Sequence, residues 1–138
     1  MRIQVSVVLL ERNGKFLVLR RPAGGHLSGL WEFPGGKKRR EEAWARCARR
    51  ELLEETGLAA ADLEEIGTMV YPYADRTVEI RFFYTAHAEG ALAADQEHAW
   101  LLPSEMNPQE FPEANGEIIR RLKKVESLKI SIPSGPRP

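Results

Sequence analysis

One stretch of the sequence, residues 36–58, restricts the fold and the chemistry more than any other. It reads GKKRREEAWARCARRELLEETGL, and its second half carries Glu51, Glu54 and Glu55 in a helical pattern. At about 3.6 residues per turn, positions i, i+3 and i+4 share one helix face, so the three carboxylates project together. Like charges at this spacing repel each other, and a bound hard cation such as Mg²⁺ removes the repulsion while retaining water for a phosphate substrate. The stretch therefore predicts a helix that binds a metal through one face.

The composition fits one globular domain in the cytoplasm. The chain has 138 residues, of which 43% are hydrophobic and 29% charged, and its formal net charge is zero, so no overall charge favours a nucleic acid or a membrane as partner. Apolar runs are shorter than the roughly 20 residues that span a bilayer. The single cysteine, Cys47, excludes a disulfide within the chain. We expect a small-molecule substrate, no stable nucleic-acid or membrane partner, and a monomer or homodimer.

The order of the expected elements indicates an α+β protein. Strands are expected at residues 3–10, 16–19, 63–73, 77–86 and 98–102, and helices at residues 41–56 and 112–125. Asn13-Gly14 predicts a tight hairpin, and Gly57 predicts a helix C-cap. Residues 20–36 are expected to form a loop packed on the core, residues 1–126 one domain, and residues 127–138 a flexible tail. Because strands and helices do not alternate regularly, we expect a mixed or antiparallel sheet covered by helices.

Several motifs resemble the Nudix hydrolases. Gly36, Glu42, Arg50-Glu51-Leu52, Glu54-Glu55 and Gly57-Leu58 match the Nudix box at every defined position. Three flanking runs are similar to the MutT branch: residues 20–26 (RRPAGGH), 30–37 (LWEFPGGK) and 111–115 (FPEAN). The resemblance implies a Nudix fold, an α/β/α sandwich with a mixed β-sheet and the Nudix helix on one face. It also implies hydrolysis of a nucleoside diphosphate linked to another group.

For the MutT branch, the resemblance implies that a nucleoside triphosphate is split to the monophosphate and pyrophosphate, with 8-oxo-dGTP as the leading substrate. Sequences similar to LWEFPGGK also occur in CTP-directed members, so CTP, another pyrimidine triphosphate or a nucleoside diphosphate sugar is the alternative. A third hypothesis is a regulatory module that binds nucleotides without catalysis. That hypothesis predicts loss of box carboxylates, and all of them are present.

The expected metal ligands lie in the box and just before it. Glu54 and Glu55 are the first choice, and Glu51 is expected to act as ligand or base. By resemblance, the backbone carbonyl of Gly35 completes the metal shell, since glycine allows the backbone to approach closely. The expected ion is Mg²⁺, with Mn²⁺ as a substitute, and a metal-bound water supplies the nucleophile. A solvated acidic face is the alternative; the spacing, Gly57 and the glycine pair favour the metal.

Two further catalytic residues are implied by the resemblance. Arg50 is expected to orient a catalytic carboxylate. MutT-type enzymes often carry another acidic residue on a loop ahead of the tryptophan matched here by Trp100. The candidates are Asp95 and Glu97, and neither stands at the usual separation. We assign Glu97 to metal binding and base catalysis.

Six residues are expected to contact the substrate, each with an alternative role. Arg21 and His26 match phosphate or sugar contacts, although His26 fits an ordinary surface histidine equally well. Phe33 and Asn115 match base contacts, and an amide presents both a donor and an acceptor to a base edge; Asn115 is also a favoured residue at a helix start. The last two expected contacts are Lys37 and Phe82. Lys37 belongs to a basic run that otherwise fits a solvated face, and the alternation of its strand also allows Phe82 to lie in the core.

Overall fold

A mixed β-sheet forms the centre of the molecule. The computed structural model describes residues 1–25 and 28–131, with side chains to residue 126. Within this part of the chain the central sheet has seven strands, ordered β3-β2-β1-β7-β6, with β4 paired to β1 and β9 to β2. Their bounds are β1 Arg2–Arg12, β2 Lys15–Arg20, β3 Trp31–Glu32, β4 Gly35–Lys37, β6 Glu64–Pro72, β7 Thr77–Thr85 and β9 His98–Leu101. A separate pair joins β5 (Ala59–Ala60) to β8 (Ala88–Glu89).

Strand β1 organises this sheet. It runs parallel to β7 and antiparallel to β2 and β4, which makes the sheet mixed. The hairpin between β1 and β2 turns at Asn13 and Gly14, with φ angles of 54° and 81°, as expected for a two-residue turn that requires positive φ. The predicted hairpin is therefore confirmed.

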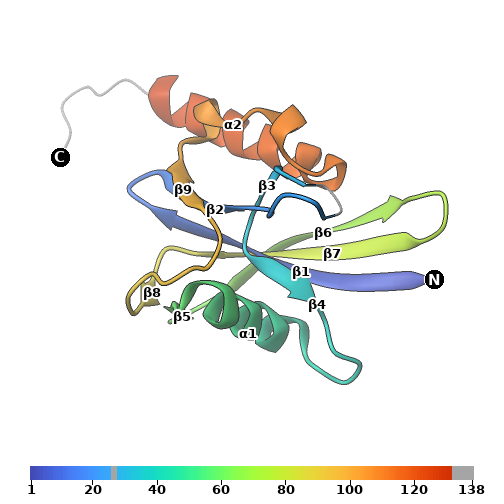
Figure 1. Cartoon of the computed structure of the whole chain (residues 1–138). Helices are drawn as coiled ribbons and strands as arrows, with labels where there is room; N and C mark the ends of the chain where they lie inside the picture. Colours follow the sequence, from blue (N-terminus) through green and yellow to red (C-terminus); the bar gives the residue numbers. More distant parts are fainter. Residues whose placement is uncertain (26–27, 132–138) are drawn as a thin grey trace.

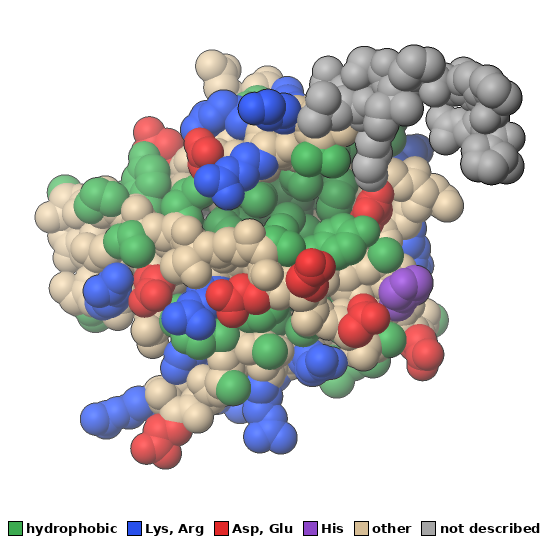
Figure 2. All heavy atoms as spheres, turned by 180° about the vertical axis from the view of Figure 1, so that it is seen from behind, with side chains coloured by type: hydrophobic (Ala, Val, Ile, Leu, Met, Phe, Trp, Pro, Cys, Tyr) green, Lys and Arg blue, Asp and Glu red, His purple; other side chains and the backbone are tan. Residues whose placement is uncertain are grey.

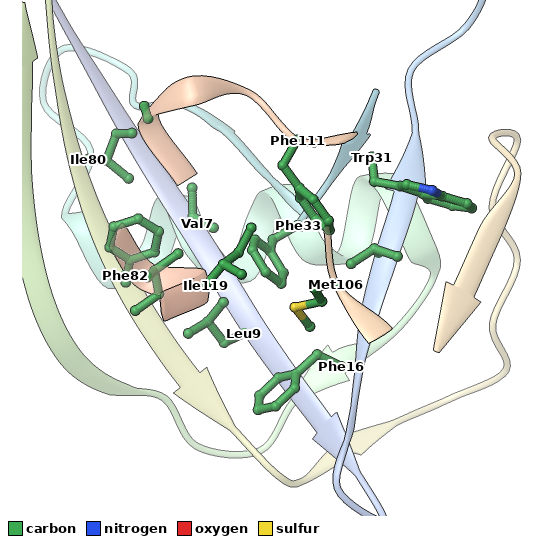
Figure 3. Packing of buried hydrophobic residues seen from close by; sticks show 13 residues of the cluster. Val7, Leu9, Phe16, Trp31, Phe33, Ile80, Phe82, Met106, Phe111 and Ile119 are labelled. Carbon is green, nitrogen blue, oxygen red and sulfur yellow. The ribbon is translucent and has the colours of Figure 1, made fainter. Parts of the chain in front are cut away.

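Alternating side chains of β1 build two cores, one on each face of the sheet. Val7 and Leu9 belong to the core under helix α2 (Gly116–Ser131), whereas Val8 and Leu10 belong to the core under helix α1 (Trp44–Thr56). Figure 1 shows the two helices on opposite faces of the sheet, and Figure 3 shows the packing of the first core. The predicted α/β/α sandwich is confirmed. Among the described helices, none has the length and apolar character to cross a membrane.

Helix α1 follows from its apolar stripe and from its C-terminal glycine. Cys47, Ala48 and Leu52 recur at helical spacing and are fully buried. The helix ends at Gly57, whose φ of 74° lies in the left-handed region and whose N–H donates to Leu53 O at 2.9 Å. The predicted C-cap is therefore confirmed.

The structure differs from the expected elements at several places. The expected loop at residues 20–36 contains β3 and the start of β4. Strand β3 has only two residues, and the glycines of β4 carry no strand signal in the sequence. Helix α1 begins at Trp44 rather than residue 41. Helix α2 begins at Gly116, after the 3₁₀ turns Pro103–Glu105, Pro108–Glu110 and Glu113–Asn115, and continues to Ser131, past residue 127, where the tail was expected to begin. Residues 132–138 lie outside the described part.

A charged pair ties the loop between β4 and α1 to the helix. The carboxylate of Glu42 accepts hydrogen bonds from Arg50 Nε at 2.6 Å and Nη2 at 2.9 Å, and from the backbone N–H of Arg39 at 3.0 Å. The Glu42 side chain is 8% exposed. These donors favour the ionised carboxylate, with Arg50 the strongest, and lower the pKa of Glu42 to about 2.

We predict that Glu42→Gln lowers the melting temperature at neutral pH. The pKa of Glu42 falls from its ordinary value of 4.5 to about 2 on folding, so its contribution is complete above the ordinary value and is lost as pH falls toward the lower one. Thermal melts followed by circular dichroism across this range should show the difference from wild type shrinking in acid. Glu41→Gln, at an exposed neighbour, is the control. A difference independent of pH would contradict the assignment.

Candidate active site

The acidic face of α1 lies against the glycine strand β4. The backbone N–H of Gly35 donates to Glu55 Oε1 at 2.8 Å. A Cβ atom on Gly36 would stand 2.3 Å from Glu51 Oε2. The missing side chain of Gly36 leaves room for the Glu51 carboxylate, and that of Gly35 leaves room for the backbone of Ser6, 2.3 Å from a Cβ at this position. The helix and the strand therefore meet through Glu51 and Glu55.

Arg50 lies between two of the three box carboxylates. Its Nη1 contacts Glu51 Oε2 at 3.4 Å and Glu54 Oε1 at 3.3 Å, while its Nε and Nη2 bind Glu42. Nη2 also donates to Lys37 O at 3.2 Å. The side chain of Glu54 is 52% exposed, whereas that of Glu51 is 16% exposed. One guanidinium thus offsets several neighbouring negative charges.

Burial disfavours the ionised forms of Glu55 and Glu51 when no cation is bound. It raises the pKa of Glu55 to about 7, against the stabilising hydrogen bond from Gly35, and the charges of Glu32 and Glu51 add to the rise. Burial also raises the pKa of Glu51, although Arg50 opposes the shift. A cation placed among these oxygens would favour their ionised forms.

The donor set fits a hard divalent cation. Its side-chain donors are carboxylate oxygens, which suit Mg²⁺ and Mn²⁺ better than soft metals. Within residues 1–25 and 28–126, no three Asp, Glu, His or Cys side chains form a ready-made metal site. Coordination of one ion by Glu54 and Glu55, as the sequence predicts, would require these carboxylates to move from their contacts with Arg50 and Gly35.

A cleft of about 340 Å³ lies beside β4. Gly35, Gly36 and Lys37 form part of its wall, so the acids of α1 adjoin the cleft across the glycine strand without lining it. Its apolar surface comes from β1, β7 and the segment before α2: Ile3, Val5, Val7, Val78, Ile80, Pro112 and Ala114. Arg21, Glu32, Tyr73, Arg76 and Asn115 contribute polar groups. The cleft thus combines an apolar surface with polar groups near the acids, as nucleotide sites do.

Four of the predicted substrate residues line this cleft: Arg21, Phe33, Lys37 and Asn115. Phe33 is held by Phe111, at 5.5 Å between ring centroids, and Figure 3 shows both rings side by side. Asn115 ends the 3₁₀ turn that precedes α2 and is 7% exposed. Its burial beside the cleft limits the amide to a few positions.

Among the described residues, Phe82 and the loop acids Glu97 and Asp95 do not line the cleft. Phe82 is 2% exposed and lies in the core near Val7 and Ile119 (Figure 3), as its alternation allowed. The Glu97 side chain is 61% exposed and pairs with Arg20 at 3.5 Å, away from the cleft lining. Asp95 is exposed. His26 lies outside the described residues.

The neighbouring Gln96 points inward instead. Its Nε2 donates to Arg20 O at 3.0 Å and lies 3.5 Å from Glu32 Oε2. The chain bends at Asp95 and Gln96, just before β9, and the side chains of Gln96 and Glu97 have different partners there. Glu97 was predicted because it is charged, but in the structure it is the amide of Gln96 that contacts the cleft residue Glu32.

Sequence reasoning missed Glu32 as a site residue. Its side chain is 20% exposed, lines the cleft and pairs with Arg21 at 3.4 Å. Burial raises the pKa of Glu32, while Arg21 and Gln96 act in the opposite direction. In the sequence, what sets Glu32 apart is that it is a single acid between two aromatic residues, Trp31 and Phe33, both of which are buried.

Comparisons with known proteins agree with this arrangement. The chain matches the NUDIX domain over residues 1–122. The CTP pyrophosphohydrolase of Escherichia coli K12 is 31% identical over 116 residues, which cover 84% of this chain and 86% of that protein. The 8-oxo-dGTP diphosphatase of the same strain is 28% identical over 127 residues, covering 90% and 98%.

Among solved structures, the solution structure of the E. coli ORF135 protein is similar, with a TM-score of 0.77 and 28% identity over 96% of this chain and 94% of that one. The predicted resemblance is thereby confirmed over most of the chain. With the box acids on α1 and the glycine strand beside them, the chain belongs to the NUDIX domain family and is a Nudix hydrolase.

Proposed function

We propose that the protein hydrolyses a nucleoside triphosphate to the monophosphate and pyrophosphate, using Mg²⁺, for which Mn²⁺ can substitute. One observation carries the proposal. The glycine strand β4 contacts the α1 acids Glu51 and Glu55 and also forms a wall of the cleft. A nucleotide whose base lies on the apolar surface therefore has its phosphate chain beside those acids.

The chain's own residues supply binding and proton transfer. Arg21 and Lys37 bind phosphate oxygens from the edge of the cleft, where charge-assisted hydrogen bonds are strong. Glu54 and Glu55 hold the cation, with the carbonyl of Gly35. Glu51 acts as a ligand or as the base that takes the proton from the attacking water.

Arg50 positions the carboxylates of Glu51 and Glu54 through the contacts described above. A bound cation would lower the pKa of a coordinated water and offset phosphate charge. In the overall reaction, water adds across the bond between the α- and β-phosphates, Glu51 can take the proton that water loses, and pyrophosphate leaves.

The preferred substrate is 8-oxo-dGTP. The E. coli 8-oxo-dGTP diphosphatase matches this chain over 98% of its own length, and the amide of Asn115 beside Phe33 suits a base edge. CTP is the second candidate because the relative named CTP pyrophosphohydrolase is 31% identical. In either case Glu32 can accept a hydrogen bond from an amino group of the base.

A substrate panel tests the proposal. Nucleoside triphosphates, 8-oxo-dGTP and nucleoside diphosphate sugars are incubated with Mg²⁺, and pyrophosphate is scored against orthophosphate. Comparison of kcat/KM ranks the substrates. The highest value for 8-oxo-dGTP supports the preferred substrate, and the highest value for CTP supports the second candidate. Absence of turnover on every compound would favour the module that binds without catalysis.

Glu54→Gln is predicted to lower Mg²⁺-dependent kcat/KM by at least ~100-fold, because a charged oxygen near the reacting phosphate is lost. The melting temperature should stay close to that of wild type, since the Glu54 side chain is 52% exposed. Glu117→Gln is the control, because Glu117 is also a helix acid paired with arginines, Arg120 and Arg121. Wild-type turnover by Glu54→Gln would refute the assignment.

Gly36→Ala is predicted to reduce kcat by roughly 10-fold or more with little loss of stability, because the new methyl group displaces the carboxylate of Glu51, a movable side chain. In contrast, Gly35→Ala brings Cβ to 2.3 Å from the backbone oxygen of Ser6 and should lower the melting temperature. Kinetics and melts of both variants check the contrast. Equal effects of the two substitutions would contradict it.

Asn115→Ala is predicted to weaken discrimination between bases more than it lowers kcat. Loss of one directional amide contact should reduce the kcat/KM ratio of 8-oxo-dGTP to dGTP by about 5- to 10-fold. The measurement is kcat/KM on both nucleotides, with Asn115→Gln as the variant that keeps an amide. A proportional loss on all nucleotides would count against a role in base recognition.

A further inference from the structure

A basic surface lies beside the candidate active site, and the mechanism above makes no use of it. We define it as Lys38, Arg39, Arg40 and Arg46. Lys38 to Arg40 lie on the loop between β4 and α1, which protrudes from the sheet in Figure 1. In Figure 2, Lys and Arg side chains project from the lower margin of the molecule, where this loop lies.

The cations of this surface are largely uncompensated. Arg39, Arg40 and Arg46 are exposed, and among the described side chains none of them forms an ion pair within 4.0 Å. Two acids follow the basic run in the sequence, Glu41 and Glu42. Of these, Glu42 is held by Arg50 at 2.6 Å. Basic residues that face only solvent need no functional explanation. Whether these residues have a role therefore depends on where they lie relative to the cleft.

The basic surface adjoins the cleft through Arg50 and Lys37. A shallow hollow of about 470 Å³ is lined by Arg39, Glu41, Glu42, Arg46 and Arg50. Arg50 donates to the carbonyl of Lys37 at 3.2 Å, and Lys37 lines the cleft. One hydrogen bond thus links the lining of the hollow to the wall of the cleft that faces the phosphate chain in the proposed function.

The acids beside the cleft oppose the approach of an anion. Glu32 lines the cleft, and Glu51, Glu54 and Glu55 adjoin it. Arg21, Lys37 and Arg76 of the lining offset part of this negative charge, and cations outside the cleft would offset more. The net charge of the chain is zero, which leaves no overall field to draw an anion inward. Local cations act over roughly a Debye length, about 8–10 Å at physiological salt, and guanidinium groups match phosphate geometry.

We propose that the basic surface captures the polyphosphate chain of the substrate and guides it into the cleft, which raises the rate of association. The identity of the substrate rests on the proposed function. A nucleic acid fits this surface less well, because its aromatic residue is already covered. Lys38 Nζ lies 5.6 Å and Arg81 Cζ 4.3 Å from the centre of the Trp44 ring, so these cations compete with a base for stacking on that ring.

Two variants with the same change in net charge test the proposal. The test variant is Arg39→Gln/Arg40→Gln/Arg46→Gln, and it spares Lys38, whose Nζ donates to Arg39 O and Arg40 O. The matched control is Arg121→Gln/Lys123→Gln/Lys124→Gln on α2, at three positions that line neither the cleft nor the hollow. Melts first establish that both variants are folded.

The binding measurement is calorimetry with inorganic tripolyphosphate, without Mg²⁺ and at low salt. We expect the test variant to bind about 5-fold more weakly than wild type or more, and the control to match wild type. In turnover assays, the test variant should lose kcat/KM by about 5- to 20-fold at low ionic strength with kcat unchanged, and the gap should close near 0.5 M salt, where the Debye length is only about 4 Å.

Three outcomes would overturn the inference: equal tripolyphosphate affinity in all three proteins, a loss confined to kcat, or an equal loss in the α2 control. Tighter binding of a single-stranded oligonucleotide than of tripolyphosphate, abolished in the test variant, would assign the surface to nucleic acid instead. If tripolyphosphate binds as expected but no nucleoside triphosphate is cleaved, the proposed function fails while the capture surface stands.

Discussion

The close approach of the Gly35–Gly36 backbone to its neighbours is the constraint on which the site depends. On one side the strand pairs with β1 so tightly that a Cβ atom on Gly35 would stand 2.3 Å from Ser6 O. On the other side the carboxylate of Glu51 occupies the space that a Gly36 side chain would fill. The same backbone forms a wall of the cleft. Two residues without side chains thereby bring the sheet, the helix and the cleft within contact of one another, and any bulk at either position separates them.

Charge balance explains how so many acids coexist beside this strand. Arg50 binds Glu42 with two hydrogen bonds and shares a third nitrogen between Glu51 and Glu54, while burial favours the protonated form of Glu55 by raising its pKa to about 7. Without a bound metal, the Arg50 guanidinium and the raised pKa of Glu55 both reduce the repulsion among the carboxylates, as a cation would. A divalent ion that binds Glu54 and Glu55 must compete with a guanidinium and a proton, so its apparent affinity depends on pH. Glu42 keeps Arg50 in place while the carboxylates rearrange.

Features that depend on residue spacing could be predicted from the sequence. Features that depend on the direction of a side chain or on close contact between backbones could not. Helical spacing placed the box acids on one face, Asn13-Gly14 marked the hairpin, and Gly57 marked the end of α1, because each is a local rule. Strand β4 was missed because glycine gives no strand signal, although glycine is what the β1 contact requires. Glu97 was chosen for its charge, yet at the bend before β9 it is Gln96 that turns inward, while Glu97 pairs with Arg20. For Phe82, alternation had left both positions open, and packing selects the core.

Base specificity is harder to derive than phosphate chemistry because the two have different structural origins. The acids and glycines come from one continuous stretch with fixed spacing. The apolar side of the cleft is the open end of a core: Val7, Phe33 and Ile80 line the cleft and belong to the cluster under α2. Such a surface accepts any base, since stacking and burial discriminate weakly. Discrimination therefore falls to polar groups from three separate segments, Glu32 on β3, Arg76 between β6 and β7, and Asn115 before α2. A small shift of any one segment changes which hydrogen bonds a base can satisfy, while the phosphates continue to meet the same acids.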